Sequence, residues 1–126
     1  MGQIKDINQQ AIDNDNFRKV IETGEHTQVV VMSIPPDGEI GEEVHDDNDQ
    51  LLLVVEGEAR LLLGEEETEF EVGDAVLVPA GVNHNVMNAG NDSLKLITTY
   101  SPPHHADGTV HHTKADADAA EEAEGH

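Results

Sequence analysis

The sequence predicts an all-β fold, an antiparallel sandwich or barrel. About eight short β-favouring segments follow one another at roughly ten-residue spacing. Turn-forming glycines, prolines and aspartates separate these segments, and none of them has a clear helical pattern. A chain of 126 residues without an internal repeat has room for one such domain with a modest core.

The first elements follow from simple patterns. Residues 1–16 are polar with scattered isoleucines, and we expect them to form a loose N-terminal arm. A strand over residues 17–22 precedes a second strand over residues 27–34. The run VVVM in the second strand is apolar without alternation, which predicts burial on both faces. The PPDG sequence then ends this strand, because proline cannot donate to a ladder and Asp-Gly favours a turn.

The central part of the chain predicts a partner subunit. A short strand over residues 40–45 leads into an acidic loop, and residues 51–55 are again wholly apolar. One face of that strand can line a barrel, but the other face needs a cover. A second sheet or a second subunit would supply the cover, so we expect a homodimer.

The remaining strands are bounded by turn residues. A hairpin turn at residues 56–58 leads from residues 51–55 into a strand over residues 59–63, and a turn at Gly64 leads into a strand over residues 68–72. A Gly-Asp turn precedes the strand over residues 75–78, and a Pro-Ala-Gly turn leads from it into a further strand that begins near His84. The last strand covers residues 94–100, because two prolines follow it.

The C-terminal part is expected to lie outside the barrel. The barrel is assigned to residues 17–103 and an acidic, histidine-containing tail to residues 104–126. Residues 114–124 could form a terminal helix, although they have no apolar stripe beyond alanine. Four histidines flank a flexible Asp-Gly turn without fixed spacing, so we interpret them as solvated, unless the tail folds over the barrel mouth as a lid. These histidines are His104, His105, His111 and His112.

The charge excludes several classes of partner. The chain has 27 acidic and 6 basic residues and a formal net charge of −21. This charge excludes general binding to nucleic acid or to anionic membranes. It favours an acidic surface adapted to salt, and hence a halophilic source, over an acidic binding patch. Without cysteine, a membrane-length apolar run or a signal-like N-terminus, the protein is expected to be soluble and cytoplasmic.

Two polar residues point to metal chemistry. Glu43 and His45 are two apart on a predicted strand, so they face the same side about 6.6 Å apart along it. Gln50 begins the adjoining strand. A carboxylate, an imidazole and an amide oxygen suit a divalent transition metal once a second imidazole joins them.

A second stretch of sequence carries a family motif. In GDAVLVPAGVNHNVMN the glycines, proline, histidine and asparagine stand at the places that the second cupin motif requires, namely Gly73, Pro79, Gly81, His84 and Asn88. The first cupin motif has two histidines separated by one residue, then a glutamate and a glycine. Its places are held here by Glu43, His45, Gln50 and Gly57, with Asp37 where the motif begins with glycine.

The chain therefore resembles the cupins over roughly residues 28 to 100. The resemblance implies a single-domain double-stranded β-helix, or jelly-roll barrel. It also implies that His84 joins Glu43, His45 and Gln50 around one ion of Fe, Mn, Ni, Co or Zn. Two histidines and one carboxylate with open positions are the pattern of non-haem iron oxygenases. The alternative is a metal-free barrel in which Glu43 and Gln50 are ordinary polar strand residues.

Three functions remain open. Cupins include dioxygenases, sugar and sugar-phosphate isomerases, lyases and decarboxylases, so the resemblance implies a metal-dependent enzyme acting on a small oxygenated molecule. Glu43 or a metal-bound water would then transfer protons. The other two are a non-catalytic ligand-binding or sensory module and a structural β-protein with a vestigial site.

Four other polar residues have separate expected roles. Tyr100 could place its hydroxyl in the pocket, or it could be an ordinary half-buried tyrosine. Asn88 is expected to fix a loop. Arg60 and Lys95 are candidates for recognising a substrate carboxylate or phosphate.

Overall fold

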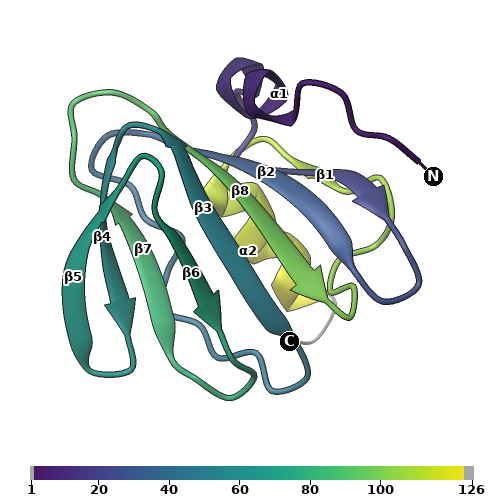
Figure 1. The fold of residues 1–126 in the computed structure, drawn as a ribbon. Coiled ribbons are helices and arrows are strands. Elements are labelled where there is room, and N and C mark those ends of the chain that lie inside the picture. The colour runs from purple at the N-terminus through teal and green to yellow at the C-terminus, as the bar shows by residue number, and fades with distance from the viewer. Residues whose placement is uncertain (1, 124–126) are drawn as a thin grey trace.

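The computed structural model describes residues 2–123 as nine strands and two helices (Figure 1). In chain order these are α1 (Ile7–Asp13), β1 (Arg18–Thr23), β2 (Gln28–Ile34), β3 (Asp49–Glu56), β4 (Glu58–Leu63), β5 (Glu66–Glu71), β6 (Ala75–Val78), β7 (His84–Asn88), β8 (Leu94–Ser101), β9 (Val110–His111) and α2 (Lys114–Ala123).

The strands form two antiparallel sheets, which confirms the predicted all-β fold. The larger sheet has the order β6-β3-β8-β2-β1-β9, and the smaller one has the order β5-β4-β7. The main core lies between the sheets, where alternate residues such as Leu52, Leu61 and Leu96 point inward. The site described below opens at one end of this core.

The prediction of a loose arm over residues 1–16 is wrong, because this segment contains the helix α1. Ala11 is fully buried against Val31 and Ile97 on the outer face of the larger sheet, and Leu53 packs against the same cluster. Ile7 and Ala11 are four residues apart and therefore share one face of the helix. A seven-residue helix has little stability of its own, so this packing is what holds it.

The burial predicted for both faces of β2 is confirmed. The outward residues of β3 are half-buried, and α1 supplies part of the cover that they were expected to need. Beyond α1 the outer face remains open at β6, where Leu77 is 61% exposed. The homodimer stays a prediction.

The prediction of a strand over residues 40–45 is wrong, because these residues form no regular strand. Two isolated bridges replace it, Glu39 with Met87 and Glu43 with His84. Between the bridges, the three residues 40–42 therefore face the two residues 85–86, as in a β-bulge. Gly41 lies between the bridges at a φ of 107°, a conformation that L side chains rarely adopt.

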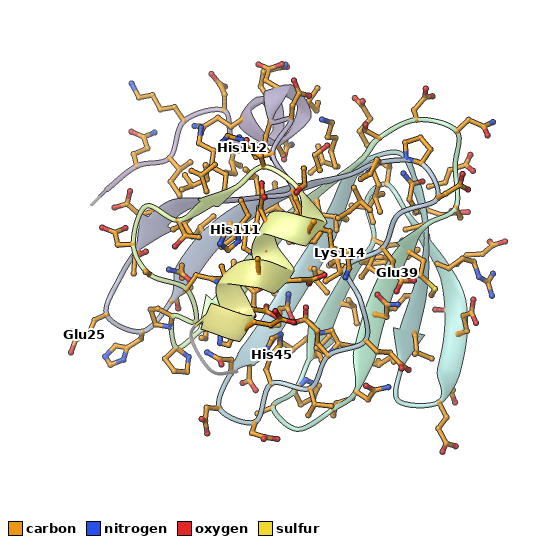
Figure 2. All side chains as sticks on the ribbon, turned by 180° about the vertical axis from the view of Figure 1, so that it is seen from behind. Glu25, Glu39, His45, His111, His112 and Lys114 are labelled. Carbon is orange, nitrogen blue, oxygen red and sulfur yellow. The ribbon has the colours of Figure 1, made fainter. Side chains whose placement is uncertain are left out.

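The C-terminal segment closes one side of the barrel. β9 extends the larger sheet beside β1, and α2 lies across the opening towards the segment around Gly41, as Figure 2 shows. Ala117 of α2 is 1% exposed and belongs to the main core. The predicted terminal helix is confirmed as far as Ala123, and its last predicted residue lies outside the described part. Neither helix within residues 2–123 has the length and apolar character needed to cross a lipid bilayer.

Candidate metal centre

Backbone pairing sets the first two candidate ligands opposite each other. Glu43 N donates to His84 O at 2.9 Å, and His84 N donates to Glu43 O at 3.0 Å. This bridge joins the irregular segment before β3 to the start of β7. Side chains of directly paired residues point to the same side of a sheet, so both project into the barrel.

Glu43 and His45 lie together, as their spacing predicts. Oε2 of Glu43 is 2.8 Å from Nε2 of His45, and the two side chains are 21% and 10% exposed. Burial raises the pKa of Glu43, but the contact with His45 and the charges of His45, Arg18 and His84 outweigh it. The net pKa of Glu43 is lowered, so this carboxylate is ionised at neutral pH and available as a ligand.

Gln50 and His84 face each other deeper in the barrel. Nε2 of Gln50 donates to Thr98 Oγ1 at 3.0 Å, which turns the amide oxygen towards His84. That oxygen lies 3.0 Å from His84 Nε2, while His84 Nδ1 lies 3.0 Å from Val82 O. Both imidazole nitrogens therefore face an oxygen acceptor.

A neutral imidazole can donate to only one of these two oxygens. Burial lowers the pKa of His84 more than the Val82 carbonyl and Glu43 raise it, so the neutral form dominates near pH 7. One of the two 3.0 Å contacts is then a pairing of two acceptors. A cation bound by Nε2 and the Gln50 oxygen would remove this repulsion, with the Val82 carbonyl orienting the ring.

These atoms fit a divalent ion. Ligand atoms of Glu43, His45 and His84 all lie within 4.8 Å of one another. Nε2 of His45 is buried and makes no hydrogen bond of normal geometry, although Glu43 is close. Adjacent ligands of an octahedral ion at about 2.1 Å are separated by roughly 3 Å, similar to the Glu43–His45 and Gln50–His84 contacts. The cluster could therefore hold a metal ion.

The C-terminal tail reaches this cluster. The ring centroid of His104 is 4.7 Å from that of His45 and 5.5 Å from that of Tyr100. The centroid of His105 is 5.0 Å from that of Tyr100, and burial lowers the pKa of His105 to about 2. The interpretation of solvated histidines is therefore wrong for His105.

A buried glutamine holds the tail in place. Oε1 of Gln28 accepts from His104 N at 3.2 Å and from His105 N at 3.0 Å. Its Nε2 donates to His105 O at 2.7 Å and to Thr23 Oγ1 at 2.9 Å. Nothing local in the sequence marks Gln28, because its partners in the tail lie more than seventy residues away.

A cavity of about 530 Å³ lies between the cluster and the tail. Its lining is rich in acidic and histidine side chains, and its residues are Glu43, Val44, His45, Asp46, Asp47, Asn48, His104, His105 and Glu121. Glu121 comes from α2, so the terminal helix forms one wall of the cavity. Burial and the nearby Glu43 raise the pKa of Glu121.

Tyr100 and Arg18 complete the interior beside the cavity. Tyr100 is 1% exposed, and burial raises its pKa to about 12, so it is a fully buried neutral phenol and not half-buried. Arg18 is also 1% exposed and was missed by the sequence analysis. The available signal was its spacing: Arg18 lies two residues before the inward-facing Val20 of β1.

The other candidates lie away from the cluster. Asn88 bonds Ile34 O, Asp92 O and Gly90 N, as expected for a residue that fixes a loop. Lys95 is buried, where Nζ donates to Asn14 O at 2.6 Å and to Ser33 Oγ at 3.0 Å. Arg60 pairs with Glu67 at 3.2 Å, and both side chains are largely exposed. Lys95 and Arg60 are absent from the cavity lining.

Comparisons with known proteins agree with this architecture. Residues 30–100 match the family model described as the cupin domain. The uncharacterized protein YrkC of Bacillus subtilis is 41% identical over 94% of this chain and 67% of its own length. The crystal structure of BH2720 from Bacillus halodurans superposes with a TM-score of 0.93 at 41% identity, covering 94% of this chain and 95% of that chain. TT1209 from Thermus thermophilus gives a TM-score of 0.72 at 26% identity, covering 80% and 98%.

Proposed function

The chain belongs to the cupin family, and from this premise we propose that it is a divalent-metal-dependent enzyme acting on a small oxygenated metabolite. The observation that carries the proposal is the Glu43, His45 and His84 cluster, whose ligand atoms lie within 4.8 Å of one another at the edge of a cavity. Perturbed titratable groups around a cavity are typical of functional sites.

Four residues would hold the ion, namely Glu43, His45, Gln50 and His84. When bound, Fe, Mn, Ni, Co or Zn would act as a Lewis acid on substrate oxygens, as dioxygenase, isomerase or lyase chemistry requires. The ligand set has one negative charge, that of Glu43, which matches the charge of the family's usual three histidines and glutamate.

The protein's own side chains would position the substrate and move its protons. Glu43 is ionised and lines the cavity, so it can accept a proton from a bound molecule. Tyr100, with a pKa of about 12, is a neutral phenol near pH 7, so it can form hydrogen bonds but cannot act as a base. The tail segment that Gln28 holds and helix α2 would limit the entry of water.

The alternative is a non-catalytic module that binds or senses a small ligand. One observation favours it: α2 and the tail cover the metal cluster, and four hydrogen bonds fix Gln28 and the tail to each other and to β1. Such a cover would favour retention of a ligand over rapid exchange.

Catalytic turnover distinguishes the proposed enzyme from the binding module. The protein would be loaded with each of the five metals and incubated with mixtures of small hydroxy acids, oxo acids and sugars, with and without dioxygen. Mass spectrometry would follow the products. The enzyme proposal predicts more than one product molecule per protein chain, with loss of turnover in Glu43→Gln. Ligand recovered unchanged and in a one-to-one ratio with the protein would support the binding module instead.

We further propose that the protein works as a cytoplasmic homodimer adapted to high salt. The apolar side chain of Leu77 on the open outer face of β6 supports the dimer, and the net charge of −21 supports the salt adaptation. Light scattering after gel filtration at high salt should give twice the chain mass of 13.6 kDa. A mass of one chain would contradict the dimer.

A further inference from the structure

Unpaired nitrogens gather at one place in the barrel. Among the described residues, three buried side-chain nitrogens have no hydrogen-bond partner: Nε of Arg18, Nε2 of His45 and Nε2 of His105. Tyr100 lies beside all three residues: its ring centroid is 5.7 Å from that of His45 and 5.0 Å from that of His105, and its side chain makes a hydrogen bond with Arg18. Buried polar groups without a partner are rare, so a cluster of them calls for a ligand or bound water. The candidate metal accounts for His45 but not for the other two.

Arg18 is the strongest of these observations. Its guanidinium is almost fully buried, and Nη1 lies 3.3 Å from Nδ1 of His111. The chain has 27 acidic residues, yet no carboxylate within the described residues forms an ion pair with Arg18. Glu43 and Glu121 interact with this charge through space, but neither forms an ion pair with the guanidinium. A buried nitrogen that lacks a hydrogen-bond partner would be stabilised by an acceptor on a bound ligand.

The positive charge of Arg18 acts on the walls of the cavity. Burial raises the pKa of Glu43, Tyr100 and Glu121, and the charge of Arg18 opposes this effect at each of them. The net pKa is lowered for Glu43 and stays raised for Tyr100 and Glu121. The charge of Arg18 also adds to the burial that lowers the pKa of His105. Glu43, His105 and Glu121 all line the cavity, and Arg18, which is not among the lining residues, is near enough for its charge to act on all three.

We propose that Arg18 and His105 form a subsite for the carboxylate of a small organic acid, whose other oxygens reach the metal cluster. Nε–H of Arg18 and Nε2–H of His105, in the tautomer that carries hydrogen there, are two donors for the two oxygens of one carboxylate. This inference rests on the proposed function, because it names the substrate class of the same site. Both nitrogens are closed to solvent, and a rotation of His105, which itself lines the cavity, would open them.

A planar monoanion fits better than a phosphate group. The cavity also has Glu43, Asp46, Asp47 and Glu121 in its wall, which would repel a dianion more strongly than a monoanion. A guanidinium edge with Nε matches the planar carboxylate in a two-bond arrangement.

The test uses the side-chain amide signals of arginine. The chain has two arginines, Arg18 and the exposed Arg60, so the ¹⁵N–¹H spectrum should contain one Nε–Hε signal from each. Zinc-loaded protein would be titrated with lactate and, separately, with its neutral analogue lactamide. We expect lactate to shift the Arg18 signal in a saturable way and to bind about tenfold or more tightly than lactamide, because a hydrogen bond to a charged group is lost in the amide. The Arg60 signal should not move.

Matched variants separate this inference from the proposed function. Arg18→Gln should weaken lactate binding about tenfold while zinc remains bound, and Arg60→Gln should change neither. If zinc binds but lactate leaves the Arg18 signal unchanged, the carboxylate subsite is refuted and the metal proposal stands. If zinc does not bind but lactate still shifts the Nε–Hε signal of Arg18, the metal proposal is refuted and the subsite stands. The titration of the parent protein is decisive even if Arg18→Gln does not fold.

Discussion

Replacing Gln28 with leucine should release the tail and destabilise the protein. Gln28 is fully buried, and its amide makes four hydrogen bonds, three of them to the backbone of His104 and His105. Leucine has a similar size but no polar atoms, so it would fill the space and leave those backbone groups without partners. The variant therefore tests whether this one side chain holds the cover over the cluster.

The size of the effect follows from the groups left unpaired. Each buried backbone group that loses its only partner costs about 1–3 kcal/mol, but the tail can regain some bonds to water. We therefore expect a loss of about 4 kcal/mol in the free energy of unfolding, a large part of the ~5–15 kcal/mol that such domains have. For a chain of 126 residues this corresponds to a Tm decrease of roughly 15 °C.

Urea unfolding at high salt would measure the free energy, and hydrogen exchange would measure protection of the His104 and His105 amides. Gln9→Leu is the matched control, because Gln9 bonds only Asp13 on an exposed helix face, at 2.8 Å. The control should lose less than about 0.5 kcal/mol. A loss below about 1 kcal/mol in Gln28→Leu, with the two amides still protected, would refute the assigned role.

Three further predictions concern pH, loop geometry and salt. Burial and the charge of Arg18 lower the pKa of His105 to about 2, so its contribution to stability is complete above the unfolded pKa near 6.5 and is lost as the pH falls below it. Allowing for partial exposure, the parent should lose about 1 kcal/mol per pH unit more than His105→Gln between about pH 6 and pH 5 in urea unfolding, and equal slopes would contradict this. Asn88→Ala should lose about 2 kcal/mol without loss of bound metal, because one buried and two partly buried hydrogen bonds disappear; loss of metal in this variant would show a direct role in the site. Raising potassium chloride from about 0.1 M to about 1 M should raise the Tm by several degrees, because it screens the repulsion of 21 net negative charges, and a Tm independent of salt would refute the salt adaptation.

Local sequence signals were sufficient for most of the fold. β6 has the predicted bounds, because a Gly-Asp turn and a Pro-Ala-Gly turn enclose it. α1 was missed because seven residues with two apolar contacts give too weak a helical pattern, and its stability comes from packing on Val31 and Ile97. The break at Gly41 was missed because a bulge depends on the partner strand as well as on the glycine.

The candidate site was predictable where it is local. Glu43 and His45 lie together because strand periodicity puts residues two apart on one side. Spacing along the sequence could not predict that His84 lies near Glu43 and His45. That expectation came from the resemblance to the cupins. Arg18 and the tail histidines meet through pairing of β9 with β1 and through Gln28, and such long-range contacts leave no local pattern.

The most direct test is the metal content of the protein itself. The parent would be purified without a chelator or a histidine tag, together with Glu43→Ala, His84→Ala and His26→Ala, and analysed by inductively coupled plasma mass spectrometry. His26 is the matched control, because its side chain is 86% exposed and lies outside the cluster. The account predicts about one transition-metal ion per chain in the parent and in His26→Ala, and almost none in the other two. A parent that holds no metal even after reconstitution, or variants that retain it fully, would contradict the metal centre.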